Sequence, residues 1–217
     1  MILLNEEGEK ASKSNINYFL EEYGMAVNSD VVIRTSFVQV IFNPNTQLFI
    51  IRISYNLRTI SYGLFQKYYH PKEALIHSNG IVNSEFCSAT SFVYPFGASL
   101  NVQPPAVPLL TSSNVCFPVN RPVAAFCPME GQMGSGKLVV FGSLQMFTDK
   151  YIAKEGNQQI AESLISFMIG EKQMRIDMFD VEVPEYVSIP DTIALSDRLK
   201  STLQVIKLNY YSRKISF

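Results

Sequence analysis

The chain has 217 residues, of which 47% are hydrophobic and 17% are charged, so it holds ample apolar material for a packed core. This composition excludes an intrinsically disordered tail, a collagen-like repeat and a long coiled coil. The net charge of −1 provides no overall positive field that would hold nucleic acid.

The beginning of the chain predicts a strand, a helix and a second strand. Residues 1–4 are apolar and predict a buried strand, and residues 5–14 predict a charged loop. Apolar residues then repeat at helical spacing, and we expect Ser14 to cap this helix and Gly24 to end it. The β-prone run 27–34 predicts the next strand.

The next part of the chain predicts a hairpin followed by a short helix. Residues 38–42 and 48–54 are β-prone runs around an Asn-Pro-Asn turn, which predicts an antiparallel pair. His70-Pro71 opens a run that we expect to be a short helix, because proline is favoured in a first helical turn. Gly80 is expected to end this unit.

The remainder of the chain mixes strands with helices. Six prolines recur between residues 104 and 128, so we expect only short strands or edge strands there. The apolar pattern predicts strands at 91–94, 98–102 and 137–141, an amphipathic helix over 160–168 ended by Gly170, and a last helix with leucines at 195, 199 and 203. Strands and helices mixed in this order favour an α/β domain built of layers.

The charges are unevenly distributed. The 42 positions between Asp30 and Glu73 hold five basic residues and no acidic one, and residues 200–217 hold four basic residues and no acidic one. The rest of the chain carries a net charge of −10. One interpretation is a patch that faces phosphate groups or a membrane surface, because clustered Lys and Arg attract both. The alternative is that the two segments differ in origin from the acidic remainder.

A glycine-rich segment has part of a phosphate-binding motif. Residues 131–137 read Gly-Gln-Met-Gly-Ser-Gly-Lys and match Gly-x4-Gly-Lys. The next residue is Leu138, where the motif needs Ser or Thr, and the segment precedes a strand instead of following one. These departures favour a glycine-rich turn before a strand over a nucleotide site.

The segment Gly142–Asp149 follows the best-defined buried strand. Ligands of open α/β sheets bind at such strand ends, so this segment is a candidate site for a small ligand or a carbohydrate. Ser143 could serve as a nucleophile, but the Gly-x-Ser-x-Gly elbow is absent. A turn into a helix, capped by Thr148 or Asp149, explains the same residues.

Cysteine and histidine give little support for catalysis or metal binding. Cys87, Cys116 and Cys127 lie in apolar surroundings and predict free buried thiols. His70 and His77 are seven residues apart, without a ligand cluster beside them, so we expect no metal site. An amidotransferase-like enzyme that pairs Cys116 or Cys127 with a histidine remains a further hypothesis.

Several long strings, in the same order along the chain, resemble the intraflagellar transport protein 52 family. The resemblance covers residues 1–34, 66–86 and 90–199, about three quarters of the chain. The strings that carry it are 15–24, 67–75, 92–100, 115–123, 136–149 and 190–199.

The resemblance implies a fold and a role. The fold is an α/β, Rossmann-like layered domain called the GIFT domain. The role is a non-catalytic core subunit of the IFT-B particle, which moves with kinesin and dynein and is needed for cilium assembly. The implied partners are other IFT-B subunits, with no nucleic acid and no membrane insertion, and no catalytic, cofactor or metal residues carry over. The implied location is the cilium or flagellum and the basal body, with a cytoplasmic pool.

The sequence departs from the family pattern in places. We expect residues 1–199 to be a partial GIFT domain, incomplete at its start, that contains a non-family insert at 36–65. Residues 200–217 are expected to be a non-family basic tail. One hypothesis is that 36–65 and 200–217 are translated non-coding sequence. Within the domain, loops 5–14 and 128–136 are expected to contact partner proteins.

Overall fold

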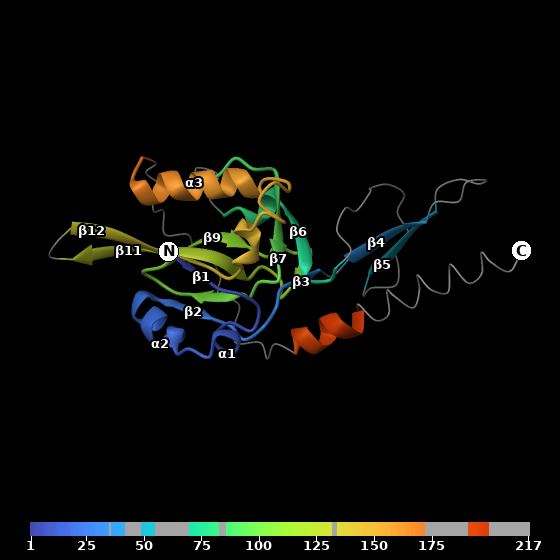
Figure 1. Ribbon diagram of the computed structural model, residues 1–217, viewed down its shortest axis with the longest axis horizontal. Helices are drawn as coiled ribbons and strands as arrows, with labels where there is room; N and C mark the ends of the chain where they lie inside the picture. The colour runs from blue at the N-terminus through green and yellow to red at the C-terminus, as the bar shows by residue number, and fades with distance from the viewer. Residues whose placement is uncertain are drawn as a thin grey trace, which may run out of the picture.

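The computed structural model describes residues 1–34, 36–41, 49–54, 70–82, 86–131, 134–171 and 191–199. The largest sheet in this part of the chain has four strands and lies at the centre of the main body (Figure 1). In spatial order they are β1 (Ile2–Leu3), β12 (Gly134–Phe141), β11 (Pro122–Gly131) and β9 (Val107–Thr111). β1 runs parallel to β12, and the other two pairings are antiparallel. The strands expected at 1–4 and 137–141 are therefore confirmed.

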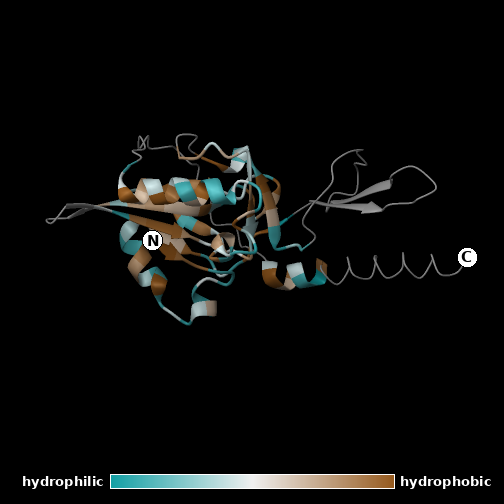
Figure 2. Ribbon diagram, turned by 45° about the horizontal axis from the view of Figure 1, so that its top comes forward, coloured by the Kyte–Doolittle hydropathy of each residue, from teal (hydrophilic) through white to brown (hydrophobic). Residues whose placement is uncertain are grey.

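Both faces of this sheet are buried. Successive residues of a strand point to opposite faces, and β12 sends Val139 and Phe141 into one core and Leu138 and Val140 into another. Hydrophobic residues accordingly fill the central strands in Figure 2. A sheet with two buried faces needs a covering layer on each side.

Helix α3 (Asn157–Ile169) covers the first face. Its buried side chains Ile160, Leu164 and Phe167 pack into the same core as Val139. The helix ends at Gly170, which takes the left-handed conformation with φ of 93°. The expected helix and its terminator are confirmed.

The second face is covered by an early helical segment and two strands. These elements are α2 (Ile16–Leu20), η1 (Glu21–Tyr23), β2 (Met25–Val27) and β8 (Leu100–Val102). Gly24 ends the helical segment with φ of 71°, as expected, and a Cβ there would lie 2.3 Å from the Gln103 carbonyl oxygen. The expected Ser14 cap is wrong, because Asn15 is the N-cap and neither side chain closes it. The expected loop 5–14 also contains a short helix, α1 (Glu9–Ser12).

The single strand expected over 27–34 is wrong. The chain forms β2, which pairs with β8, and then β3 (Ile33–Arg34), which pairs with β10 (Cys116–Phe117). Between them, the backbone N–H groups of Asn28 and Val32 donate to the carbonyls of Ser99 and Gly97. These bonds hold a loop and not a regular strand ladder.

The short helix expected at His70 is also wrong. The structure has strand β6 (Glu73–His77), paired antiparallel with β7 (Ser91–Pro95), and then the 3-10 turn η2 (Ser78–Gly80). Ala74 and Ile76 are buried at alternate positions, and this two-residue period belongs to a strand. Pro71 lies in the preceding turn, where its favoured helical position has no effect.

The proline-rich segment contains a longer strand than expected. β11 has 10 residues and pairs with neighbours on both sides. Its prolines still obey the physical rule: Pro122 is its first residue, and Pro128 lies beyond Phe126, where pairing with β9 ends. Pro108 lies in β9, the outer strand of the sheet.

The hairpin expected from residues 38–42 and 48–54 is confirmed in the part that the structure describes. β4 (Ser36–Ile41) and β5 (Phe49–Ser54) pair antiparallel over six residues, and Phe42 and Leu48 lie outside the described residues. The hairpin lies apart from the central sheet and its covering helices in Figure 1.

The last described element is a helix over residues 192–199. The Asp191 carboxylate accepts hydrogen bonds from the backbone N–H groups of Ile193 and Ala194, so it caps the helix. Leu195 and Leu199 are half-buried, whereas the third expected leucine, Leu203, lies outside the described residues.

The described residues form a mixed, sheet-rich α/β domain. Among the described strands, β1 and β12 form a parallel pair and the other paired strands are antiparallel. None of the helices in the described part of the chain is long and apolar enough to cross a membrane.

Candidate functional site

The carboxyl end of β12, a candidate ligand site in the sequence, is filled by the protein itself. Gly142 follows the strand, and a Cβ at this residue would lie 2.1 Å from the Ala98 carbonyl oxygen. The Tyr94 hydroxyl occupies the same place and donates to that carbonyl at 2.7 Å. Burial raises the pKa of Tyr94 well above its usual value, and the nearby Asp30 carboxyl adds to the effect. The Tyr94 hydroxyl therefore stays protonated and serves as a structural donor.

Ser143, Thr148 and Asp149, which follow this strand end, do not have the roles considered for them in the sequence. The buried Ser143 hydroxyl donates its proton in a hydrogen bond to the Pro95 carbonyl. A nucleophilic serine would have to lose this proton to a base. The next element is the 3-10 turn η3 (Gln145–Phe147), and Thr148 follows it instead of opening a helix. The Thr148 hydroxyl donates to the Gln145 carbonyl at 2.8 Å, and Asp149 is exposed. The expected capping roles of Thr148 and Asp149 are wrong.

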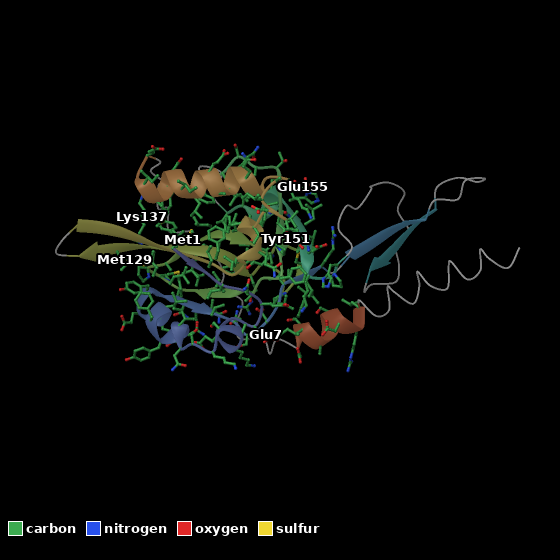
Figure 3. All side chains as sticks on the ribbon, in the orientation of Figure 1. Met1, Glu7, Met129, Lys137, Tyr151 and Glu155 are labelled. Atoms are coloured by element: carbon green, nitrogen blue, oxygen red, sulfur yellow. The ribbon has the colours of Figure 1, made fainter. Side chains whose placement is uncertain are left out.

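The glycine-rich segment is the tip of a β-hairpin, as the turn interpretation predicted. Gly131 of β11 pairs with Gly134 of β12. Lys137, the lysine of the incomplete phosphate motif, donates from Nζ to the Phe167 carbonyl at 2.6 Å. Its Nζ also lies 4.1 Å from the centroid of the Phe167 ring. Figure 3 shows Lys137 and Met129 on this hairpin, beneath the end of α3. The ammonium group is thus bound to the carboxyl end of α3.

The three cysteines are free and buried, as expected. Cys87 and Cys116 lie in the core on the α3 side of the sheet, and Cys127 lies in the core on the other side. Burial raises the pKa of Cys116 to about 12 and raises that of Cys127 as well. A thiol with a raised pKa holds little thiolate at neutral pH, so this environment opposes a nucleophilic role.

The two histidines lie at opposite ends of β6. His70 precedes the strand, its Nδ1 accepts a hydrogen bond from the Lys72 backbone N–H, and its ring packs against Phe96 with centroids 4.9 Å apart. His77 is the exposed last residue of the strand. Among the described residues, no group of three or more His, Cys, Asp or Glu side chains could hold a metal ion.

A buried polar network beside β8 was not predicted from the sequence. The Asp30 carboxylate accepts hydrogen bonds from the Ser99 backbone N–H at 2.8 Å and from the Ser99 hydroxyl at 2.6 Å. Asn28 donates to the Ser99 hydroxyl and exchanges hydrogen bonds with Asn101, to which Arg121 donates in turn. Burial raises the pKa of Asp30 despite the bonds from Ser99 and the attraction of Arg121. Because Asp30 and Ser99 are far apart in the sequence, no local motif signals this network.

The structure reduces the basic patch that the charge pattern suggested. Arg34 and Lys72, two of the five basic residues between Asp30 and Glu73, are buried in the body. The Lys72 ammonium forms an ion pair with Glu6 at 2.6 Å. Both charges therefore contribute to the folded body and not to a surface that attracts a partner.

Exposed apolar side chains mark surfaces that the sequence did not single out. On α2, Tyr18 is 80% exposed and Phe19 is 41% exposed. On α3, Ile165 and Ile169 lie one turn apart and are 58% and 69% exposed. Such residues on opposite covering layers of the sheet are available to a protein partner.

Comparison with known proteins identifies relatives of this chain. A model of the IFT52 GIFT domain matches residues 1–52 and 42–182. Intraflagellar transport protein 52 homolog of Mus musculus is 36% identical over 226 residues, a match that covers 94% of this chain and 46% of the mouse protein. The Homo sapiens homolog is 36% identical over 225 residues, which cover 94% of this chain and 44% of the human protein. The chain thus spans less than half the length of the curated relatives it matches.

A solved structure agrees with the sequence comparison. The structure of the mmIFT52 N-terminal domain superposes with a TM-score of 0.61 at 39% sequence identity. The superposition covers 79% of this chain and 65% of the solved chain. The family model and the solved domain agree, and this chain belongs to the IFT52 GIFT domain family.

Proposed function

We propose that this chain is a non-catalytic structural subunit of the intraflagellar transport IFT-B particle. In this role it supports cilium assembly and ciliary cargo transport through protein–protein contacts. The observation that carries the proposal is membership of the IFT52 GIFT domain family, together with the names of its mouse and human relatives. Its partners are other IFT-B subunits and, indirectly, kinesin and dynein motors. Its location is the cilium or flagellum and the basal body, with a cytoplasmic pool.

The chemistry of the described residues supports a scaffold over an enzyme. Ser143 and Tyr94 donate to backbone carbonyls, and Lys137 binds the end of α3. Cys116 is buried with a pKa raised to about 12. These groups stabilise the fold, and the same packing at Gly142 disfavours the alternative of a carbohydrate site at this strand end.

We also propose a domain boundary inside the chain. Residues 1–199 form a Rossmann-like GIFT domain, an inference that the layers on both faces of its sheet support. Residues 36–65 form an insert, and residues 200–217 lie outside the domain. The Arg34 backbone N–H donates to the Pro71 carbonyl at 3.0 Å, so the body holds Arg34 and Pro71, on either side of the insert, close together. The family model matches the chain in two overlapping segments, 1–52 and 42–182, and the break between them falls within residues 36–65.

Affinity purification tests the proposed function. The full chain carries a tag in ciliated cells, and we expect IFT-B subunits among the purified proteins and the tag in cilia. Absence of IFT-B subunits would overturn the proposal.

Matched surface variants test which loop makes the contact. Lys10→Ala with Lys13→Ala changes two exposed residues in loop 5–14, and Gln158→Ala with Gln159→Ala changes two exposed residues on α3. If loop 5–14 binds a partner, the first pair reduces recovery of IFT-B subunits and the second pair leaves it unchanged. Equal recovery with both pairs would place the contact elsewhere, for example at the β11–β12 hairpin end formed by residues 128–136.

A further inference from the structure

The turn η2, which follows strand β6, contains a chemically labile pair of residues, Asn79–Gly80. It is the only Asn-Gly pair in the sequence. Asn79 is exposed, whereas Gly80 is buried. An asparagine side chain is most open to attack by the next backbone nitrogen when the next residue is glycine, because glycine has no Cβ to hinder the approach. The pair therefore combines a reactive sequence with access to water.

Packing in the body fixes glycine at position 80. A Cβ at Gly80 would lie 2.3 Å from Cγ2 of Ile76 and 2.8 Å from the Thr111 carbonyl oxygen, both closer than Cβ atoms approach other atoms in proteins. A larger residue would slow attack on the Asn79 side chain, but this packing leaves no room for one. The fold thus places the least protective neighbour beside an exposed asparagine.

The contacts that hold Asn79 lie at the surface. Its Nδ2 donates to the Asn114 Oδ1 at 3.0 Å, in an exposed contact between two turns. The backbone of η2 has a hydrogen bond from the Ile81 N–H to the Ser78 carbonyl at 3.0 Å. A single 3-10 turn has poorer hydrogen-bond geometry than an α-helix, and exposed turns open locally at low free-energy cost. Such opening brings the Gly80 nitrogen to the Asn79 side chain.

We propose that Asn79–Gly80 is a site of spontaneous deamidation that converts Asn79 to isoaspartate and aspartate. The Gly80 backbone nitrogen bonds to the Asn79 Cγ, the Cγ–Nδ2 bond breaks, and the proton of the attacking nitrogen leaves with the amide as ammonia. Water then opens the succinimide ring at one of its two carbonyl carbons. One opening produces isoaspartate and the other produces aspartate. This inference is independent of the proposed transport function.

Conversion changes the connection between β6 and β9. The residues after the turn attach to β9 through a bridge between Ile81 and Leu110. The Val82 N–H also donates to the Leu109 carbonyl at 3.1 Å. Isoaspartate adds a methylene to the backbone of the turn that leads into these contacts, and we expect the converted protein to melt about 2–4 °C lower. Ion exchange separates this form by its added negative charge, and an unchanged melting temperature would overturn the assigned structural effect.

Incubation followed by peptide mapping tests the site itself with the full chain. The folded protein is held at about pH 7.5, where the attacking nitrogen can lose its proton to the solvent. After denaturation, cleavage at Glu73 and Glu85 releases peptide 74–85, and fragmentation in the mass spectrometer locates the mass gain and separates isoaspartate from aspartate. We expect roughly tenfold more conversion at Asn79 than at Asn28, whose amide belongs to the polar network beside β8. No conversion at Asn79, or conversion at Asn83 alone, would overturn the proposal.

Two matched variants assign the reaction to one side chain. Asn79→Gln lengthens the side chain, so that ring closure is disfavoured, and we expect it to abolish conversion in peptide 74–85. Asn15→Gln makes the same change at another exposed asparagine and should leave conversion of Asn79 unaltered. Equal conversion in the peptide from both variants would overturn the assignment to Asn79.

A sample unfolded in urea shows what the fold contributes. The unfolded chain sets the rate of conversion without tertiary structure. We expect the folded chain to convert Asn79 more slowly by no more than about tenfold, because η2 is exposed and opens readily. Stronger protection in the folded chain would show that the turn closes the site and would overturn the proposal.

Discussion

Two asparagine side chains bind the backbone N–H and carbonyl of a strand residue, in the position where a neighbouring strand would pair. The Asn17 amide donates to the Val27 carbonyl and accepts from the Val27 N–H, and the Asn157 amide forms the same pair of bonds with Val93. Asn157 also donates to the Tyr151 carbonyl. A primary amide has both a donor and an acceptor, as a peptide unit has, so it can satisfy the edge of a strand.

Replacing Asn157 tests how much this edge contact stabilises the fold. Asn157→Ala leaves the buried Val93 N–H without its partner and opens space in the core. We expect a loss of about 2–4 kcal/mol in the free energy of unfolding, measured by urea denaturation. The neighbouring exposed change Gln158→Ala is the control, with an effect within about 0.5 kcal/mol. Similar values for the two variants would show that the amide bonds contribute little.

The buried Asp30 carboxyl makes the stability of the fold depend on pH. Burial raises its pKa from 3.8, so the folded protein binds this proton more tightly than the unfolded chain does. Its contribution to stability is therefore complete below pH 3.8 and is lost as the pH rises through the raised pKa. Asp30→Asn keeps an acceptor for the Ser99 N–H and a donor for its hydroxyl, and it does not titrate.

We expect the stability of Asp30→Asn, relative to the unchanged protein, to increase from about pH 4 toward neutral pH. Urea denaturation over this range measures the difference, and the comparison cancels the titration of groups common to both proteins. A difference that falls with pH would mean that Ser99 and Arg121 outweigh burial and lower the pKa of Asp30.

At the scale of elements, Lys137 adds a polar contact between the β11–β12 hairpin and α3 to the packing of Phe126 against Phe167. The last carbonyls of a helix have no partner within the helix and carry partial negative charge. Lys137 supplies both a hydrogen bond to the Phe167 carbonyl and a cation over the Phe167 ring. Lys137 thus links strand β12 to the carboxyl end of α3, the helix that covers this face of the sheet.

Changing Lys137 is expected to weaken this contact. Lys137→Met keeps the apolar stem and removes the charge, and we expect a loss of about 1 kcal/mol in thermal or urea denaturation. Lys137→Arg retains a cation and should restore most of the loss. A nucleotide-dependent rise in melting temperature that disappears in Lys137→Met would revive the phosphate interpretation of the glycine-rich segment.

The errors in the predicted elements have particular physical causes. Pro71 suggested a helix start, but pairing of β6 with β7 and burial of Ala74 and Ile76 outweigh that local preference. The run 27–34 read as one strand, yet Asp30 draws its middle toward Ser99. In both places contacts with residues distant in the sequence decide the conformation.

At the scale of the whole molecule, the insert is expected to be dispensable for folding. Deletion of residues 36–65 leaves the hydrogen bond between Arg34 and Pro71 and the pairing of β3 with β10. A shorter connection also costs less closure entropy, by about 1 kcal/mol or more. We expect the variant to melt cooperatively at a temperature no lower than that of the full chain. A broad or earlier transition in calorimetry would show that the insert is part of the core.

Transcript sequencing addresses the origin of the insert. Spliced reads that keep codons 36–65 in frame would overturn the hypothesis of translated non-coding sequence. Their absence would assign the domain to the flanking sequence alone.

Local sequence patterns predict the apolar strand at 137–141, the helix that ends at Gly170, the hairpin around 38–54 and the family resemblance. These features depend on local periodicity, terminators and long matching strings, all of which one chain displays. Long-range contacts place β11 inside a sheet, bring Asp30 to Ser99, and bind Lys137 to α3, and no local pattern indicates these. Packing also fills the strand end at Gly142. These contacts form between segments far apart in the sequence. Burial and hydrogen bonding over the whole fold select them, so no local sequence pattern predicts them.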